Sequence, residues 1–472
     1  MTMLKKESNI PLYIQIRDIL QEKILSGEFP TGYKLPGERQ LAAELGVSRN
    51  TIIHTYNALI DQGLAVVSQK PKGYFVGHTE PNVPKRIFQP LSKLIKNQYK
   101  TNKNIFEEQY YSFYSRKLID MGRISIKNEK QDCGSITFKE LYSCGEEETL
   151  KLKQHICDML KKQSIYVNEN NIQLLSETSQ ILEYIISIYL DKGDYVFIEE
   201  PASTDTINVF RNKEINLITV PMTEEGMDLE ELRRLIRIYA PKLIYTMPNL
   251  HNPTGITMPL NRRYELLQIS KEEEIPIVED NSLKDLRYDG RELTPLFAID
   301  SNKMVLYMDT FTLTSVPGIK VAYVVGPREP VEVIGNILFT SECRMYNVSH
   351  TLINRTIEEG HYQNHIDEIK RECRASRDYL CKKMEPLKEK GIKFNIPEGG
   401  PCLWCELPGD VNENTLFALC LQKGLIYMPG NAFYPYGYMG NAHIRLCFSN
   451  VTKKEIEKAV HILAEALEES RI

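Results

Sequence analysis

The chain has 472 residues, too many for one hydrophobic core, so we expect two or three domains. Hydrophobic residues make up 42% and charged residues 26%, which is ordinary for a soluble globular protein. The net charge of -5 excludes a global electrostatic attraction to nucleic acid; residues 1–77 hold nine Lys or Arg and seven Asp or Glu, a net of +2, so the remainder carries -7.

Residues 10–77 are expected to form a compact unit of three helices and a two-stranded hairpin. Isoleucines and leucines at helical spacing mark the first helix, and Gly46 with Val47 makes a turn before the third. The expected elements are a first helix that ends at Gly27, a second over residues 38–45, a third from a Ser48 cap to about Gln62, and strands over 64–68 and 74–76.

Short motifs in this unit follow one another at the spacing of a known DNA-binding module. The longest is Lys34-Leu-Pro-Gly-Glu-Arg-Gln-Leu-Ala42, and the others fill residues 11–15, 25–27, 45–51 and 73–76. Together they resemble a GntR-type winged helix-turn-helix. The resemblance implies sequence-specific binding to duplex DNA, with the third helix in the major groove and the hairpin as the wing.

The N-terminus of the third helix is the expected reading surface, because helix N–H groups and the helix dipole favour phosphate there. Arg49 can reach a guanine edge or a phosphate, and Asn50 can read a base. Instead of contacting DNA, Arg49 and Lys72 could be solvated surface charges, and Thr51 could cap the helix or pack in the core. The residues expected to contact DNA are Arg39, Ser48, Arg49, Asn50, Thr51, Lys70 and Lys72.

Residues 78–115 contain three prolines and little periodicity, so we expect a linker there, followed by a large domain over residues 116–472. Strand and helix patterns alternate in the large domain, which is typical of a mostly parallel sheet with helices on both faces. The strand candidates are residues 172–175, 195–198, 215–220, 243–246, 277–279, 305–308 and 321–325. A long helical region to about residue 390 precedes a smaller mixed part with strands at 403–406 and 443–448.

The segment that ends at Tyr323 carries the most informative substitution in the chain. It reads Thr310-Phe-Thr-Leu-Thr-Ser-Val-Pro-Gly-Ile-Lys-Val-Ala-Tyr323 and resembles the part of fold-type I aminotransferases that carries the Schiff-base lysine of pyridoxal phosphate (PLP). Pro317, Gly318 and Tyr323 fix the register, which places Leu313 at the lysine position. Leucine has no amine, so it can neither form an imine with PLP nor transfer a proton.

Other positions of the large domain resemble cofactor-binding and substrate-binding residues of the same family. The resemblance implies that Thr178, Ser179 and Gln180 hold the PLP phosphate at a helix N-terminus, Asn252 the phenolic oxygen and Asp280 the pyridinium nitrogen, that Lys320 also contacts the phosphate, and that Arg445 grips a substrate carboxylate. No residue is assigned a catalytic role.

Three of the matched positions depart from the family pattern. Thr178 stands where glycine is usual in the phosphate turn, and Ser282 stands where a tyrosine is common. Lys320 replaces an arginine, which keeps the charge but loses the planar fork. We therefore expect an eroded cofactor site in which PLP, if present, binds without a covalent bond.

The retained residues also have purely structural interpretations. Asn252, which precedes a proline, could be a turn residue, and Asp280 at a strand end could cap a following helix. Arg445 inside an apolar strand needs a partner if it is buried, and an internal salt bridge would serve.

Metal, redox and membrane roles have little support in the sequence. His361 and His365 are four residues apart on an expected helix, but no carboxylate constellation accompanies them. Cys402 and Cys405 form a lone C-x-x-C in an expected strand, so we expect reduced thiols and no metal site. The N-terminus lacks the apolar core of a signal peptide, and no apolar run reaches the ~20 residues that span a bilayer, so we expect a cytoplasmic protein.

Over its length the chain resembles the MocR subfamily of regulators, in which a winged helix is fused to an aminotransferase-like domain. The resemblance implies a homodimer formed by the large domain, a DNA operator and a small-molecule effector. The first hypothesis is a transcription regulator that senses PLP, a PLP–amino acid adduct, or an amino acid or amine, without covalent attachment. The alternative is a PLP-dependent aminotransferase with residual activity, which would lack the group for transaldimination and proton transfer, and loss of a general acid/base alone costs ~10²–10⁴ in rate. The sequence names no operator, regulated gene or sign of regulation.

Overall fold

The computed structural model describes residues 12–25, 28–29, 32–61, 64–69, 72–76, 111–112, 146–311, 319–340, 348–437, 442–449 and 451–471. Leu313, Pro317, Gly318 and Lys70 lie outside this part of the chain, as does the side chain of Lys72. The chain divides into two compact units.

The first unit is the predicted arrangement of three helices and a hairpin. Its elements are α1 (Leu12–Leu25), α2 (Glu38–Leu45), α3 (Arg49–Asp61) and the antiparallel strands β1 (Ala65–Gln69) and β2 (Lys72–Val76). Ile16, Leu20, Ile52 and Leu59 from α1 and α3 are almost fully buried and make its core. Tyr56 is also buried, and its hydroxyl donates to the Pro36 carbonyl at 2.6 Å, which ties α3 to the segment before α2.

The second unit is built on an eight-stranded sheet, with the strand order β4-β11-β10-β9-β8-β5-β6-β7. The strands are β4 (Ile172–Leu175), β5 (Tyr195–Glu200), β6 (Asn216–Thr223), β7 (Gly226–Met227), β8 (Leu243–Thr246), β9 (Ile277–Asp280), β10 (Val305–Thr310) and β11 (Ala322–Val325). The five strands from β10 to β6 run parallel, whereas β11 is antiparallel to both neighbours. The mostly parallel sheet expected from the sequence is confirmed.

Helices cover both faces of this sheet, because successive side chains of the buried strands point to opposite sides. Leu306 and Met308 pack in a core with α8 and α9, while Tyr307 between them packs in another core with α7 and α14. The helices in this part of the chain are α7 (Glu146–Lys161), α8 (Thr178–Tyr189), α9 (Thr204–Asn212), α11 (Leu260–Glu273), α12 (Leu296–Ile299), α13 (Arg328–Thr340) and α14 (Val348–Glu358), with the short turns η2 (Glu169–Asn171) and η3 (Lys284–Leu286). Helix α10 (Leu229–Tyr239) lies between β7 and β8 in the chain.

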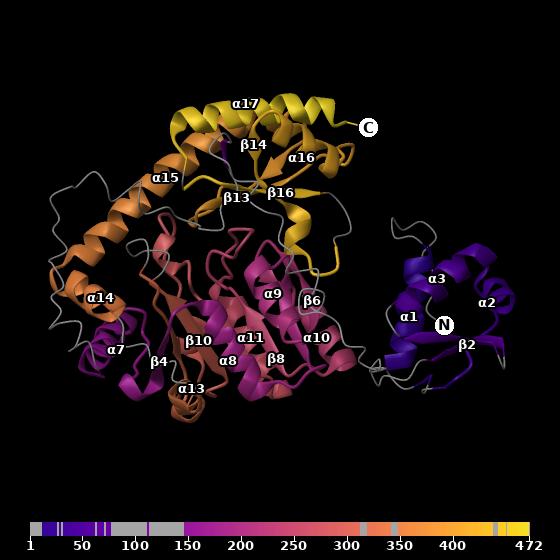
Figure 1. Ribbon diagram of the computed structural model, residues 1–472, viewed down its shortest axis with the longest axis horizontal. Helices are drawn as coiled ribbons and strands as arrows, with labels where there is room; N and C mark the ends of the chain where they lie inside the picture. The colour runs from indigo at the N-terminus through magenta and orange to yellow at the C-terminus, as the bar shows by residue number, and fades with distance from the viewer. Residues whose placement is uncertain are drawn as a thin grey trace, which may run out of the picture. The chain divides into compact units, whose positions relative to one another are not determined.

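A smaller C-terminal part completes the second unit. The 28-residue helix α15 (His361–Lys388) runs from beside α14 to this part, where it packs on α17 (Lys453–Glu469) (Figure 1). A four-stranded sheet has the order β12 (Lys393–Phe394), β13 (Cys402–Glu406), β16 (His443–Cys447) and β15 (Met428–Pro429). The remaining elements are α16 (Glu413–Gln422), β14 (Leu425–Ile426) and the short turn η4 (Gly430–Phe433).

One strand comes from the stretch that the sequence predicts to be a linker. Tyr111 and Ser112 form β3, whose backbone pairs in parallel with β14. These two residues of the 78–115 stretch therefore belong to the second unit by hydrogen bonding, which the weak local periodicity did not indicate. The rest of that stretch lies outside the described residues.

A buried histidine between α7 and α14 gives the second unit a testable pH dependence. The His350 side chain is 1% exposed and its Nδ1 lies 3.1 Å from the Thr149 hydroxyl. Burial lowers the pKa of His350 to about 4. In the unfolded chain, His350 has an ordinary pKa of about 6.5, so it binds a proton at a pH where the folded protein keeps it neutral. The free energy of unfolding therefore decreases as the pH falls from about 6.5 to about 4.

We expect His350→Gln to remove roughly 2–3 kcal/mol of the stability loss between pH 7 and pH 4. The measurement is urea unfolding at several pH values, compared with His461→Gln, which changes an exposed histidine on α17. Parallel pH profiles for wild type and His350→Gln would contradict the assignment.

Candidate functional site

The candidate pocket starts at the carboxyl ends of the parallel strands β8 and β9. Because these strands are neighbours and run in the same direction, their last residues meet at one edge of the sheet. Tyr245 on β8 and Asp280 on β9 are both buried, and the tyrosine hydroxyl donates to Asp280 Oδ2 at 2.6 Å. Thr206 on α9 donates in turn to the Tyr245 hydroxyl at 3.1 Å.

The buried carboxylate of Asp280 accepts hydrogen bonds from several donors. Its Oδ1 accepts the Ser282 N–H at 2.9 Å and also the Ser282 hydroxyl, which closes a local turn. The carboxylate does not cap a helix, because the next helical turn, η3, begins at Lys284 and has no side-chain cap. Burial raises the pKa of the Asp280 carboxyl, while the hydrogen bonds from Ser282 and Tyr245 lower it. The net effect raises the pKa of Asp280, and among the described residues no ion pair includes it.

Asn252 and Arg445 come from distant parts of the chain and are in direct contact. Asn252 follows β8, Arg445 lies on β16, and Arg445 Nη1 donates to Asn252 Oδ1 at 3.1 Å. The Arg445 guanidinium also lies 3.2 Å from Met428 Sδ and 4.9 Å from the centre of the Phe433 ring. The arginine is 4% exposed, which leaves a charged, planar donor group in a largely apolar setting.

The turn predicted to hold a phosphate forms the start of α8. Thr178, Ser179 and Gln180 are its first three residues, and Glu177 is the residue that precedes the helix. Gln180 is turned back on the chain, because its Oε1 accepts both the N–H and the hydroxyl of Ser176. Lys320 Nζ lies 2.9 Å from Glu177 Oε1, so this cation is paired with an acid of the protein itself.

Glu199 anchors the loop that carries Asn252. Its carboxylate accepts the Thr246 hydroxyl at 2.6 Å and the Met247 N–H at 2.9 Å, and His251 Nε2 lies 3.4 Å away. All of these groups are buried. The loop after β8 therefore leaves the sheet with its first residues fixed, and Asn252 follows directly.

Four of the residues described above were missed by the sequence interpretation. Tyr245 lies in the run that ends at Gly255, but nothing in the pattern shows which strand residue faces Asp280. Phe433 and Met428 contact Arg445 from the segment just before β16, and the pairing of β15 with β16 places Met428 opposite Arg445. The pairing of Glu177 with Lys320 can be foreseen only when the register of β4 and β11 is known.

The first unit presents the residues predicted to contact DNA around the start of α3. Ser48 caps the helix: its Oγ accepts the Thr51 N–H at 3.1 Å and lies 2.8 Å from the Thr51 hydroxyl. Arg39, Arg49 and Asn50 are exposed. Ser48 and Thr51 thus order the helix start on which the other side chains stand.

Arg49 is held in place by an acid on α2. Its Nε donates to Glu38 Oε2 at 2.8 Å, and the Tyr74 hydroxyl on β2 donates to Glu38 Oε1 at 2.9 Å. The hydrogen bond from Arg49 is the main cause of the lowered pKa of the Glu38 carboxyl, with Tyr74 next. Arg49 is thus an exposed guanidinium whose ion pair with Glu38 bridges α2 and α3.

Comparison with known proteins connects both units to families. Residues 125–463 match the family "Aminotransferase class I and II", and residues 12–76 match "Bacterial regulatory proteins, gntR family". The chain belongs to the class I and II aminotransferase family. With its GntR domain at the N-terminus, it is a MocR-type transcription regulator with an aminotransferase-like domain.

Individual proteins show the same two-part organisation or the same fold. The chain is 26% identical over 476 residues to the HTH-type transcriptional regulator YdfD of Bacillus subtilis, covering 98% of each chain. It is 24% identical over 397 residues to the probable rhizopine catabolism regulatory protein MocR of Rhizobium meliloti, covering 79% of this chain and 76% of that protein. The α-aminoadipate aminotransferase LysN of Thermus thermophilus, solved with N-(5'-phosphopyridoxyl)-L-leucine, shares the fold with a TM-score of 0.66 at 24% identity, over 77% of this chain and 93% of that one.

Class I and II aminotransferases normally bind PLP, and the two ends of the pocket of this regulator fit that group unequally. At the ring end, buried Asp280 suits a pyridinium N–H, and the amide of Asn252 can donate to a phenolic oxygen. At the phosphate end, the residues do not fit, because the Glu177 carboxylate precedes the first turn of α8 and holds Lys320. Asp280 and Asn252 thus suit the ring of PLP, whereas Glu177 and Lys320 do not suit its phosphate.

Another lysine of this regulator, Lys284 on η3, is held by two acids. Lys284 Nζ lies 2.7 Å from Asp285 and 2.9 Å from Asp309. Burial alone would lower the pKa of Lys284, but the charges of Asp285 and Asp309 outweigh it and raise the pKa well above its ordinary value. The ammonium stays protonated and is not a nucleophile.

Other features of the regulator do not extend the site. The cysteines of the C-x-x-C, Cys402 and Cys405, are buried free thiols on β13. The described residues contain no group of three or more His, Cys, Asp or Glu side chains that could hold a metal ion, and none of their helices is long and apolar enough to cross a membrane. His361 pairs with Glu359 at 3.2 Å.

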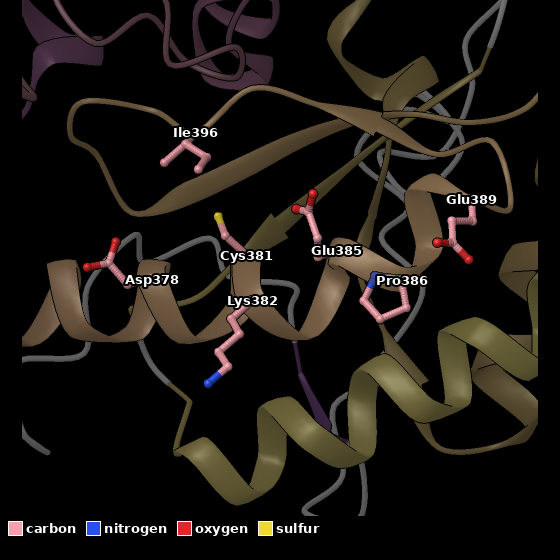
Figure 2. A pocket seen from close by; sticks show the side chains of 7 residues that line it. All are labelled: Asp378, Cys381, Lys382, Glu385, Pro386, Glu389 and Ile396. Atoms are coloured by element: carbon pink, nitrogen blue, oxygen red, sulfur yellow. The ribbon is translucent and has the colours of Figure 1, made fainter.

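A wide surface hollow of about 640 Å³ lies along α15, away from the predicted site residues. Cys381 and Glu385 point toward the segment that carries Ile396, whereas Lys382 points away (Figure 2). Its acidic rim of Asp378, Glu385 and Glu389 contains no residue of the candidate pocket.

We expect Tyr245→Phe to destabilise the second unit by about 1.5–3 kcal/mol, because a buried carboxylate loses a charge-assisted hydrogen bond. The readout is urea unfolding at neutral pH, with Tyr264→Phe as the control, since Tyr264 is 52% exposed. Equal stabilities of the two variants would show that the hydroxyl of Tyr245 does not support Asp280.

Proposed function

We propose that this regulator binds DNA as a dimer and that the pocket around Asp280 binds a small effector without a covalent bond. The division we propose is DNA binding by residues 1–77, connection by residues 78–115, and effector binding and dimerisation by residues 116–472. The observations that carry the proposal are the contact between Asn252 and Arg445 and the buried carboxylate of Asp280 at the end of β9. Such buried polar groups are costly to maintain unless a ligand or the fold uses them.

The candidate effectors are PLP, a PLP–amino acid adduct, and an amino acid or amine. Arg445 suits a carboxylate, because its guanidinium can form two parallel hydrogen bonds. Asp280 suits a pyridinium or an ammonium group.

Transamination is the weaker interpretation of the pocket. It requires an amine at the position of Leu313, which lies outside the described residues. The nearest matched lysine, Lys320, has a side chain that is 62% exposed and pairs with Glu177. With Lys284 also held by two acids, none of these side chains supplies a neutral amine for covalent catalysis.

DNA reading would use the start of α3, with a second copy of the chain reading the other half-site. Arg49 stands exposed between Ser48 and Asn50 and is oriented by Glu38. Lys70 and Lys72 on the wing remain proposed backbone contacts, as does Arg39 on α2. The larger second unit would carry the dimer contacts, because the apolar residues of the first unit are used in its own core.

We expect Arg49→Ala to reduce specific DNA affinity by about 1–3 kcal/mol, because a base-edge or phosphate contact is lost. The assay is fluorescence anisotropy with a duplex selected from a random pool by the full-length protein. Arg17→Ala is the matched control, since Arg17 pairs with Asp18 on α1. Unchanged affinity of Arg49→Ala would refute this docking of α3.

We expect Leu313→Lys to create an aldimine absorbance band with added PLP that wild type lacks, because the variant restores the amine. Wild type should release PLP completely on dialysis, with no lysine adduct trapped by borohydride. A folded Leu313→Lys protein that takes up no PLP would remove PLP from the candidate effectors.

Carboxylate ligands should raise the melting temperature of wild type, and Arg445→Ala should lose this thermal shift. Arg371→Ala, on the exposed side of α15, should keep it.

A further inference from the structure

The juxtaposition of Glu177 and Lys320 follows from the register of two strands. In the antiparallel pair of β4 and β11, Leu175 lies opposite Ala322 and Leu174 opposite Tyr323. Continuing this register by two residues beyond each strand places Glu177 opposite Lys320. Their 2.9 Å ion pair is therefore built into the backbone where the chain leaves the sheet for α8.

The start of α8 would otherwise attract an anion. The first N–H groups of a helix lack acceptors within the helix and carry a partial positive charge. Glu177, directly before Thr178, makes no side-chain hydrogen bond to cap the helix. Its carboxylate instead holds Lys320, so the protein's own anion stands at the place where a ligand phosphate would lie.

The charges at this end of the pocket work against a phosphate. Glu177 and Lys320 together carry no net charge, whereas a phosphate monoester carries about -1.5 to -2 at neutral pH. The two side chains are 31% and 62% exposed, so the ion pair itself contributes little to stability. The unfavourable part is the repulsion between an incoming phosphate and the Glu177 carboxylate, which is tied to the N-terminus of α8 by the chain.

We propose that Glu177 is a specificity-determining residue that disfavours the binding of phosphate-bearing ligands to this pocket. Of the candidate effectors above, the pocket would then bind an unphosphorylated amino acid or amine. The inference rests on the effector pocket proposed above. Arg445 and Asp280, at the other end, supply the charges that such a ligand needs. Thr178 acts in the same direction, because its side chain stands where the matched family usually has glycine.

The test compares two probes that differ only in a phosphate, pyridoxine and pyridoxine 5'-phosphate. Neither has an aldehyde, so covalent attachment to a lysine cannot contribute to binding. The full-length protein contains a single tryptophan, Trp404, opposite Arg445 on the neighbouring strand and 5.3 Å from the Phe433 ring, so its fluorescence reports on the pocket. Equilibrium dialysis gives an independent Kd for each probe.

In wild type, we expect the phosphate to give no gain in affinity. In Glu177→Gln, the Kd of pyridoxine 5'-phosphate should fall by at least about tenfold while that of pyridoxine stays unchanged, because the like charge is removed. Adding Lys320→Gln to this variant should abolish the gain, since the freed ammonium would hold the phosphate. Glu183→Gln, which changes an exposed acid on the same helix, is the control and should behave as wild type.

Two negative outcomes have different meanings. If both probes bind but Glu177→Gln leaves the ratio of their Kd values unchanged, the role of Glu177 is overturned and the effector pocket stands. If neither probe binds wild type or any variant, the ring end of the pocket is lost as well, and both the inference and the proposed cofactor-like pocket are overturned.

Discussion

The parallel pairing of β8, β9 and β10 determines where chemistry can occur in this regulator. Each strand is buried on both faces and ends at the same edge of the sheet, so polar side chains at the ends are the first that can meet a ligand. Asp280 takes its position from this pairing, and Tyr245 from the neighbouring strand supports it. The loop to Asn252 starts from the same edge and is fixed by Glu199.

Much of the architecture follows from local sequence patterns. The three helices and hairpin of the first unit have strong start and stop residues, such as Ser48, and their core residues recur at helical spacing. The strands of the large sheet are short apolar runs, which the sequence shows clearly. Motif matching also placed Asn252, Asp280 and Arg445 in a common site, and the structure brings the first and last of these into contact.

The remaining features depend on pairings between distant segments and leave no local signal. The antiparallel direction of β11 is set by its two neighbours, and the same register brings Glu177 to Lys320. The sequence match assigned Gln180 to phosphate binding, but its side-chain oxygen accepts a hydrogen bond from Ser176 within the same turn. Lys284 carries no motif at all, yet it is held by its chain neighbour Asp285 and by the buried Asp309 at the end of β10.

The pairing of β3 with β14 has a mechanical consequence. The chain that leaves β2 is next described at Tyr111, and the backbone there is hydrogen-bonded to the C-terminal part, close in sequence to Met428 on β15. Tyr111 and Ser112 are therefore attached to the part of the second unit that also carries Arg445, and not to the strand edge that carries Asp280. A movement of the C-terminal part would carry these two residues with it.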